Sequence, residues 1–443
     1  MRIIFIVLDF IAFIAATFLG SFIRTGQYDC FYAVTNLTVL TPSFFLSIFL
    51  LWIFSFYEFD FIHKKLFKYQ NIILIFILNS FLSAGLIYFT STLFKTTTPK
   101  TNLFIILALY FLFVYLSRRI YIALKLKLKK INMVFLGSSH TVDTIIEEIS
   151  KYSNYNIFIN SETVDSKITK IILKNFKKIS FVVVSNELLS SKHKWQQDFL
   201  LKGLVVKSEM DFFEDLFSRV PKIAFDNSLW LLNYISNRNT GRSIKRAADI
   251  LISLILLPFC FTAGLIIYFA VLVCDRQNPI FVQIRVGVNG KIIVLYKFRT
   301  MIIGTENSTK LGKILRRFRL DELPQLFNIL KGDASFVGPR PIWSKEYKYL
   351  NKYIHNHKLR NIVRPGITGW AQLNYAAPNF SKFIRQPNEE NEANFLRASE
   401  KRLAYDLWYI KNQSISLDME IIFKTIKRMF ISDKKITKAE KDS

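Results

Sequence analysis

Long apolar runs alternate with short polar segments over the first 130 residues of the chain. Four runs, at about 3–23, 39–57, 70–94 and 102–124, are each close to the ~20 residues that cross a bilayer core as a helix. The pattern predicts a four-helix transmembrane bundle over 1–130. The first run carries Asp9, shows no small-residue cleavage site and is followed by three more, so we expect a retained anchor rather than a signal peptide.

Basic residues mark which side of the membrane the bundle ends face. They gather after the second run, at Lys64, Lys65 and Lys68, and after the fourth, where Arg118 and Arg119 begin a cluster. By the positive-inside rule, we expect both ends of the bundle to face the cytoplasm.

Short apolar runs separated by helix-like polar stretches follow over 131–220. This alternation predicts a small parallel sheet with helices, a truncated Rossmann-like α/β module. A dinucleotide site requires G-x-G-x-x-G after the first strand, whereas the chain has Gly137-Ser138-Ser139-His140, so a scaffold or regulatory module is favoured. The polar segment at 221–240 is interpreted as a linker, with asparagines at Asn227, Asn237 and Asn239.

A further apolar run holds no charge from 250 to 274 and has Pro258 in its interior. Proline removes a backbone hydrogen bond and clashes with the preceding turn, so Pro258 is a suitable place for a helix to break. We expect a re-entrant membrane helix over about 247–274 that keeps both flanks on the cytoplasmic side. An ordinary proline-kinked span is the alternative.

Composition supports a membrane protein, since 51% of the residues are hydrophobic and 43 are Phe. The net charge of +27 fits anionic lipid headgroups and phosphorylated ligands better than nucleic acid, because no nucleic-acid recognition motif accompanies it. The three cysteines are too few and too scattered for a disulfide framework or a zinc site.

Candidate chemistry follows the apolar run. Asn289-Gly290 between β-rich runs predicts a hairpin over 279–300, which presents Arg285, Lys297 and Arg299. The next segment, 311–319, has apolar residues at helical spacing against a cationic face. It suits an interfacial helix, and a solvated basic helix is the alternative.

Two adjacent carboxylates, Asp321 and Glu322, lie next to arginines that include Arg316. We expect Asp321 at the start of a helix, whose N-terminal dipole favours phosphate and holds a carboxylate ionised; a plain N-cap is the alternative. Two glycine-containing loops then follow, one with Arg340 and one with Arg364, and glycine permits close backbone approach. The pattern indicates phosphate chemistry at a membrane.

Five motifs in this order resemble the bacterial sugar transferases, the polyprenol-phosphate hexose-1-phosphate transferases also called monotopic phosphoglycosyl transferases. The resemblance covers about 241–430. The preceding bundle and α/β module resemble the larger, multi-span branch of that family. The matching stretches are Lys245 to Asp249, Lys297 to Met301, Leu320 to Leu326, Gly332 to Pro341 and Arg364 to Trp370.

The resemblance implies transfer of hexose-1-phosphate from a UDP-sugar to undecaprenyl phosphate, with UMP released, as the first step of surface polysaccharide synthesis. Asp321 is then the nucleophile of a covalent phosphosugar intermediate, and Glu322 helps to hold Mg²⁺ or manages protons. Asp321 and Glu322 are the metal candidates. The candidates for binding substrate phosphate are Lys297, Arg299, Arg316, Arg340 and Arg364.

The expected architecture is a mixed membrane protein. It has the four-helix bundle, the Rossmann-like module and an α+β catalytic domain over 241–443 with its proline-broken re-entrant helix. We expect the bacterial inner membrane, a catalytic domain on the cytoplasmic face, contact with membrane lipid, no nucleic-acid partner, and bundle faces that permit a homodimer. A glycosyltransferase that releases UDP and a non-catalytic scaffold of a polysaccharide assembly complex remain as alternative functions.

Three details complete the expectation. The family commonly has Ser-Pro at the helix break, where this chain has Leu257-Pro258, which leaves the bend geometry open. His355 and His357 lie among lysines and asparagines and are expected to be solvated rather than a metal pair. The amphipathic segment Met419 to Phe430 predicts a helix that packs on the domain or lies at the interface.

Overall fold

The structure, a computed structural model, divides into two compact units, Met1–Leu216 and Phe217–Ser443. The bundle and the α/β module therefore fall in one unit, and the finer division proposed from the sequence stays a prediction. The residues that the structure describes are 2–53, 56–57, 69–94, 100–128, 131–151, 155–190, 194–226, 239–276, 278–305, 307–376, 378 and 380–430.

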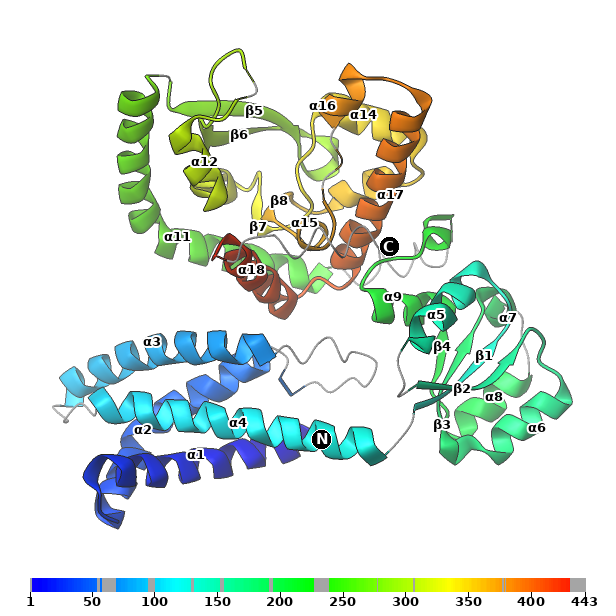
Figure 1. Cartoon of the computed structure of the whole chain (residues 1–443), viewed down its shortest axis with the longest axis horizontal. Helices are drawn as coiled ribbons and strands as arrows, with labels where there is room; N and C mark the ends of the chain where they lie inside the picture. The colour runs from blue at the N-terminus through cyan, green and yellow to red at the C-terminus, as the bar shows by residue number, and fades with distance from the viewer. Residues whose placement is uncertain are drawn as a thin grey trace. The chain divides into compact units, whose positions relative to one another are not determined.

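Four apolar helices open the first unit: α1 (Arg2–Thr25), α2 (Cys30–Ile53), α3 (Tyr69–Phe94) and α4 (Lys100–Leu128). Figure 1 shows them lying side by side. Stretches of α1, α2 and α4 are long and apolar enough to cross a membrane, and α3 holds a shorter apolar stretch, Ile75–Tyr88. The predicted membrane character is confirmed. Helix α2 starts at Cys30, earlier than the predicted boundary at 39.

A charged pair lies inside this bundle. Arg118 donates to Asp9 through both of its Nη atoms, Nη2 at 2.7 Å, and Tyr57 Oη donates to the same carboxylate at 2.6 Å. Both side chains of the pair are 0% exposed. Counting Arg118 as a loop charge was therefore wrong, because it neutralises a carboxylate that would otherwise be buried alone. Lys64, Lys65 and Lys68 lie outside the described residues, and the orientation stays a prediction.

The α/β module has a four-stranded parallel sheet of order β2-β1-β3-β4. Its strands are β1 (Ile131–Leu136), β2 (Tyr155–Ser161), β3 (Ile179–Val184) and β4 (Val206–Ser208). The helices are α5 (His140–Ser150), α6 (Ser166–Lys174), α7 (Asn186–Ser190), α8 (Lys194–Leu201) and α9 (Glu209–Phe217). A small parallel sheet is thus present, and the Rossmann-like assignment stays a prediction.

A carboxylate of the chain occupies the carboxyl end of this sheet. Glu209 is buried and accepts hydrogen bonds from Ser139 Oγ and, at 3.0 Å, from Asn186 N. Gly137 beside it has φ +92°, and a Cβ there would lie 2.0 Å from Ser185 Oγ. Parallel α/β sheets bind phosphate at this edge. Here Glu209 takes up donors that would otherwise face an anion.

The second unit combines helices with a hairpin and a short parallel strand pair. Its elements are η2 (Lys222–Asp226), α11 (Asn239–Ala270), η3 (Val271–Asp275), β5 (Ile280–Val286), η4 (Val288–Gly290), β6 (Ile292–Phe298), α12 (Lys310–Arg317), η5 (Leu320–Glu322), α13 (Gln325–Lys331), β7 (Ser335–Val337), α14 (Ser344–Tyr353), η6 (His357–Ile362), β8 (Gly366–Thr368), α15 (Trp370–Asn374), α16 (Phe380–Arg385), α17 (Glu389–Lys411) and α18 (Ile415–Phe430). Of the predicted linker, Asn227 and Asn237 lie outside the described residues, and Asn239 already begins α11.

Helix α11 contains Pro258 and changes direction along its length, as Figure 1 shows. Thr262 Oγ1 donates to Pro258 O at 2.9 Å, a back-bond that also bends helices. Near its start, Arg246 donates to the carbonyls that end α13, while near its end Val271 packs against Phe298 and Leu315. Both ends of the bent helix are therefore held by other elements of the second unit. Re-entry into the membrane stays a prediction.

The predicted hairpin is confirmed. Strands β5 and β6 pair antiparallel from Ile280↔Phe298 to Val286↔Ile292. Asn289 and Gly290 both carry positive φ, 53° and 79°, as such a turn requires.

Two further predicted helices are present. Helix α12 ends at Arg317, with Ile314 55% exposed and Leu315 buried. Its place at the membrane interface stays a prediction. Helix α18 begins at Ile415 and buries Leu417 and Ile421, so it packs on the domain.

Candidate active site

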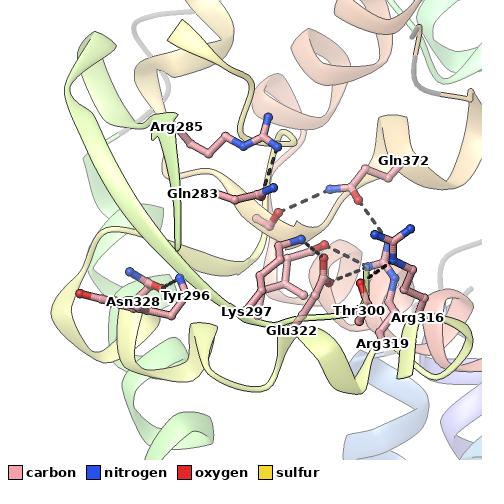
Figure 2. Close-up of polar contacts among 12 residues, drawn as sticks. Gln283, Arg285, Tyr296, Lys297, Thr300, Arg316, Arg319, Glu322, Asn328 and Gln372 are labelled. Carbon is pink, nitrogen blue, oxygen red and sulfur yellow. Dashed lines mark hydrogen bonds and ion pairs between the residues drawn. The ribbon is translucent and has the colours of Figure 1, made fainter. Parts of the chain in front are cut away.

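Asp321 and Glu322 lie in the 3₁₀ turn η5, between α12 and α13. The chain enters this turn through Arg319, whose φ of 53° is in the left-handed region that L residues rarely adopt. Arg319 Nη1 donates to Ile367 O at 3.0 Å and Nη2 to Gln372 Oε1 at 3.4 Å. These bonds fasten the turn to β8 and α15, and Figure 2 shows the one to Gln372.

The prediction that Asp321 begins a helix was wrong. Helix α13 starts at Gln325, with Pro324 as its N-cap, so the carboxylate is separated from that helix by the 3₁₀ turn. A helix dipole acts within about its first turn, so it is not what controls the charge of Asp321. Side-chain charges do so instead.

Glu322 forms the central ion pair of the site. Lys297 Nζ, from β6, lies 2.8 Å from Glu322 Oε1, and the two side chains are 19% and 14% exposed. Oε2 lies 3.7 Å from Arg319 Nη1 and, among the described residues, has no hydrogen-bond partner. Burial alone would raise the pKa of Glu322, but Lys297 and Arg319 outweigh it and the pKa is lowered. Glu322 is therefore ionised at neutral pH.

The pKa of Asp321 is shifted in the opposite direction to that of Glu322. Its burial, and then the negative charge of Glu322, raise its pKa, while Lys297 and Arg316 oppose the rise. A carboxylate with a raised pKa holds a proton more strongly and is the more basic of the two. The adjacent residues thus differ in character because of what surrounds them.

The structure gathers some of the predicted phosphate-binding residues around this pair. Arg316 is exposed and donates through Nε to Thr300 Oγ1 at 2.8 Å (Figure 2). Arg340 is close enough for its charge to contribute to the lowered pKa of Glu322. Lys297, Arg316 and Arg340 therefore act on the carboxylates directly.

The other two cations lie in different surroundings. Arg299 Nε donates to Asn278 O at 2.8 Å, and its guanidinium lies 5.4 Å from the ring centre of Phe281. Arg364 Nε donates to Gly332 O at 2.9 Å and lines a cavity of about 390 Å³ with Lys245 and Asp249. Their roles in substrate binding stay predictions.

The glycines of the two loops allow backbone to pack on backbone. Gly338 N donates to Thr368 O and Gly366 N to Pro339 O, both at 2.9 Å. A Cβ on Gly366 would lie 2.0 Å from Gly338 N, and one on Gly369 would lie 2.1 Å from Gly338 O. The loops that carry Arg340 and Arg364 are thereby locked to each other.

The prediction that both histidines are solvated was wrong for His357. His355 is exposed as expected, but His357 is only 3% exposed and its Nδ1 lies 3.0 Å from Asn351 Oδ1. Burial, and then the charge of Arg360, lower its pKa well below the usual value, so His357 is neutral.

Sequence reasoning also missed a polar face of α17, where Ser399, Arg402 and Asp406 are buried. Their i, i+3, i+7 spacing, which places them on one face of a helix, was the available signal.

The second unit, Phe217–Ser443, which we call the catalytic unit from here on, contains the region that matches known proteins. The sequence profile described as "Bacterial sugar transferase" matches residues 240–432. An uncharacterized sugar transferase of Bacillus subtilis (strain 168), EpsL, is 36% identical over 202 residues, which are 43% of this chain and 89% of the relative. The chain belongs to the bacterial sugar transferase family.

Two larger relatives carry specific names. A UDP-glucose:undecaprenyl-phosphate glucose-1-phosphate transferase of Klebsiella pneumoniae is 39% identical over 200 residues, 42% of this chain and 40% of the relative. A UDP-N-acetylgalactosamine-undecaprenyl-phosphate N-acetylgalactosaminephosphotransferase of Aeromonas hydrophila is 38% identical over 200 residues, 42% of this chain and 43% of the relative. This bacterial sugar transferase thus spans about two fifths of the length of these two relatives.

Proposed function

We propose that this bacterial sugar transferase moves a hexose-1-phosphate from a UDP-sugar to undecaprenyl phosphate, releases UMP, and so begins synthesis of a surface polysaccharide. The observation that carries the proposal is the Asp321–Glu322 pair, in which Lys297 Nζ lies 2.8 Å from Glu322 Oε1. Burial raises the pKa of Asp321, whereas the nearby cations lower that of Glu322. Relatives that act on UDP-sugars and undecaprenyl phosphate, by their names, support the substrate class.

In the proposed reaction, a carboxylate oxygen of Asp321 attacks the phosphorus that bears the sugar. The bond from that phosphorus to the bridging oxygen breaks, and UMP leaves with the electron pair. An oxygen of undecaprenyl phosphate then attacks the same phosphorus and expels Asp321, which regenerates the enzyme. Lys297, Arg316 and Arg340 reduce the repulsion between anions as they approach.

The donor set suits Mg²⁺. A buried carboxylate oxygen without a hydrogen-bond partner among the described residues, Glu322 Oε2, is the kind of ligand that Mg²⁺ takes, and one or two carboxylates plus substrate phosphates suffice. Asp321 and Glu322 would hold the ion, which when bound neutralises charge on the donor diphosphate.

We further propose that α11 is re-entrant and that the catalytic unit lies on the cytoplasmic face of the inner membrane. The apolar surface of α11 supports lipid contact, since Phe259 is 70% and Ile266 72% exposed. A reporter fused after residue 430 is expected to read out as cytoplasmic. A periplasmic readout would refute re-entry and favour a kinked span. The α/β module is proposed as a scaffold or regulatory element, and a homodimer is proposed through the bundle.

The decisive experiment measures nucleotide release by the detergent-solubilised protein with undecaprenyl phosphate, Mg²⁺ and a panel of UDP-sugars. UMP with one donor supports phosphosugar transfer and names the sugar. UDP would instead favour a glycosyltransferase, and neither nucleotide would favour the scaffold.

Substitution tests the nucleophile separately. Asp321→Asn is expected to abolish turnover, while Asp198→Asn, the same change in the α/β module, keeps it. Quenching the enzyme with donor alone is expected to leave a hexose-phosphate mass on the peptide that contains Asp321. Asp321→Asn activity above a few per cent of wild type would exclude this residue as nucleophile.

A further inference from the structure

A cavity of about 280 Å³ lies in the catalytic unit, and neither Asp321 nor Glu322 is among the residues that line it. Its walls come from β5, the loop that follows β7, α14, η6 and α17. The charged residues that line it are Arg285, Arg340, Arg360, Arg402, Glu346 and Asp406. Arg340 connects the cavity to the active site, because its charge also acts on Glu322.

Two buried polar side chains from α17 line this cavity. Arg402 is 6% and Ser399 4% exposed, and both line the cavity. Within the described part of the chain, Arg402 Nη1, Arg402 Nη2 and Ser399 Oγ have no hydrogen-bond partner. Buried donors without partners are costly, and a buried cation is more so. Such groups are expected where a ligand completes the hydrogen bonds.

The neighbouring Arg360, which lines the same cavity, does have hydrogen-bond and ion-pair partners. Its guanidinium lies 2.8 Å from Asp406 Oδ2 in an ion pair, and its Nη2 donates to Arg340 O at 3.0 Å. Asp406 is thus already engaged and does not supply a hydrogen-bonded counter-ion to Arg402.

Positive charge exceeds negative charge around the cavity. Four arginines face the carboxylates of Glu346 and Asp406. Burial, the largest effect in each case, lowers the pKa of Arg285 and of Arg402 to about 10, so both stay protonated at neutral pH. The guanidinium of Arg285 also lies 5.0 Å from the ring centre of Trp343. Its Nη2 donates to Gln283 Oε1 at 3.2 Å, as Figure 2 shows.

We propose that this cavity binds a phosphate group of a substrate, with Arg402 and Ser399 as its binding residues. A phosphate supplies several acceptor oxygens, which the two Nη atoms of Arg402 need as hydrogen-bond partners. It also carries at least one negative charge, which offsets the excess of positive charge around the cavity. The assignment of that phosphate to the donor nucleotide or to the lipid acceptor rests on the proposed function.

The proposal is tested by isothermal titration calorimetry, which measures the binding of small ligands to the full-length protein in detergent. The probes are inorganic phosphate, UMP, uridine and a short-chain polyprenyl phosphate. We expect Arg402→Gln to weaken the phosphate-bearing probe that binds best by about tenfold or more, as loss of a charge-assisted bond predicts, and Ser399→Ala to weaken it less. Arg397→Gln, on the exposed face of the same helix, is the control and should keep wild-type affinity.

Comparing the probes distinguishes the two possible sources of the phosphate, the donor nucleotide and the lipid acceptor. Arg402-dependent binding of UMP assigns the cavity to the donor, and Arg402-dependent binding of the polyprenyl phosphate assigns it to the acceptor. Uridine binding as tightly as UMP, or equal affinities in wild type and Arg402→Gln, would overturn the proposal.

Thermal stability of the ligand-free protein separates binding from a structural role. Because neither Nη atom of Arg402 has a hydrogen-bond partner among the described residues, Arg402→Gln should leave the melting temperature unchanged or raise it. Weakened binding together with a clearly lowered melting temperature would show a structural role and overturn the assignment. If the wild-type protein releases no UMP with any donor, the proposed function is refuted. The phosphate-binding role of Arg402 is still decided separately, by the calorimetric comparison of wild type with Arg402→Gln.

Discussion

The Lys297–Glu322 pair permits a quantitative test of how the active site is held. Lys297→Met leaves Glu322 charged in a site where it is only 14% exposed. Removing one partner of a fully buried pair costs roughly 3–5 kcal/mol, and since this pair keeps some contact with water, we expect about 2–3 kcal/mol. For a folding unit of 150–250 residues, each kcal/mol lowers the melting temperature by roughly 2–4 °C, which gives a loss of about 4–12 °C.

A double-mutant cycle measured by tryptophan fluorescence isolates the interaction. Glu322→Gln removes the charge that Lys297→Met leaves without its nearest partner, so the double variant should melt above Lys297→Met alone. The matched control is Lys222→Met, which breaks a pair of similar length, 2.9 Å, whose lysine is 77% exposed, and it should barely change the melting temperature. If the losses of stability in Lys297→Met and in Glu322→Gln alone add up to the loss in the double variant, the two residues are not coupled and the reasoning is refuted.

Three further outcomes follow from the same structure. Because Lys297 lowers the pKa of the proposed nucleophile, Lys297→Met should move the acidic limb of the kcat/KM–pH profile to higher pH, and a move to lower pH would contradict this. Gly366→Ala should sharply reduce the yield of folded protein, since its Cβ would lie 2.0 Å from a facing backbone nitrogen, whereas Gly264→Ala, with its nearest neighbour at 3.8 Å, should be tolerated in the same size-exclusion assay. Arg118→Met should destabilise the membrane-extracted protein, and adding Asp9→Asn should recover part of the melting temperature; no recovery would argue against their pairing.

Local signals account for the elements that the sequence predicts well. The hairpin was predictable because Asn289 and Gly290 tolerate positive φ at little cost and lie between runs of β-formers. The apolar helices follow from length and hydropathy alone.

Contacts between distant segments account for what the sequence did not show. Arg118 lies near the end of an apolar run, as charges that flank a membrane span do, and only its contact with Asp9 reveals that it is buried. His357 is surrounded in sequence by polar residues, yet the fold buries it beside Arg360. The turn that carries Asp321 depends on Arg319 adopting a left-handed conformation, which a local propensity argument disfavours and which bonds to Ile367 and Gln372 stabilise.

The same distant contacts decide which carboxylate is available for chemistry. Asp321 and Glu322 are consecutive, so local sequence alone gives no reason for their pKa values to move apart. Lys297, on a hairpin strand, bonds Glu322 and lowers its pKa, while burial and the resulting negative charge raise that of Asp321. Pairs of titratable groups whose environments separate their pKa values mark different chemical roles. Glu322 is then the fixed anion of the site and Asp321 the more basic group, so Lys297 on strand β6 sets apart the carboxylate that we propose as the nucleophile.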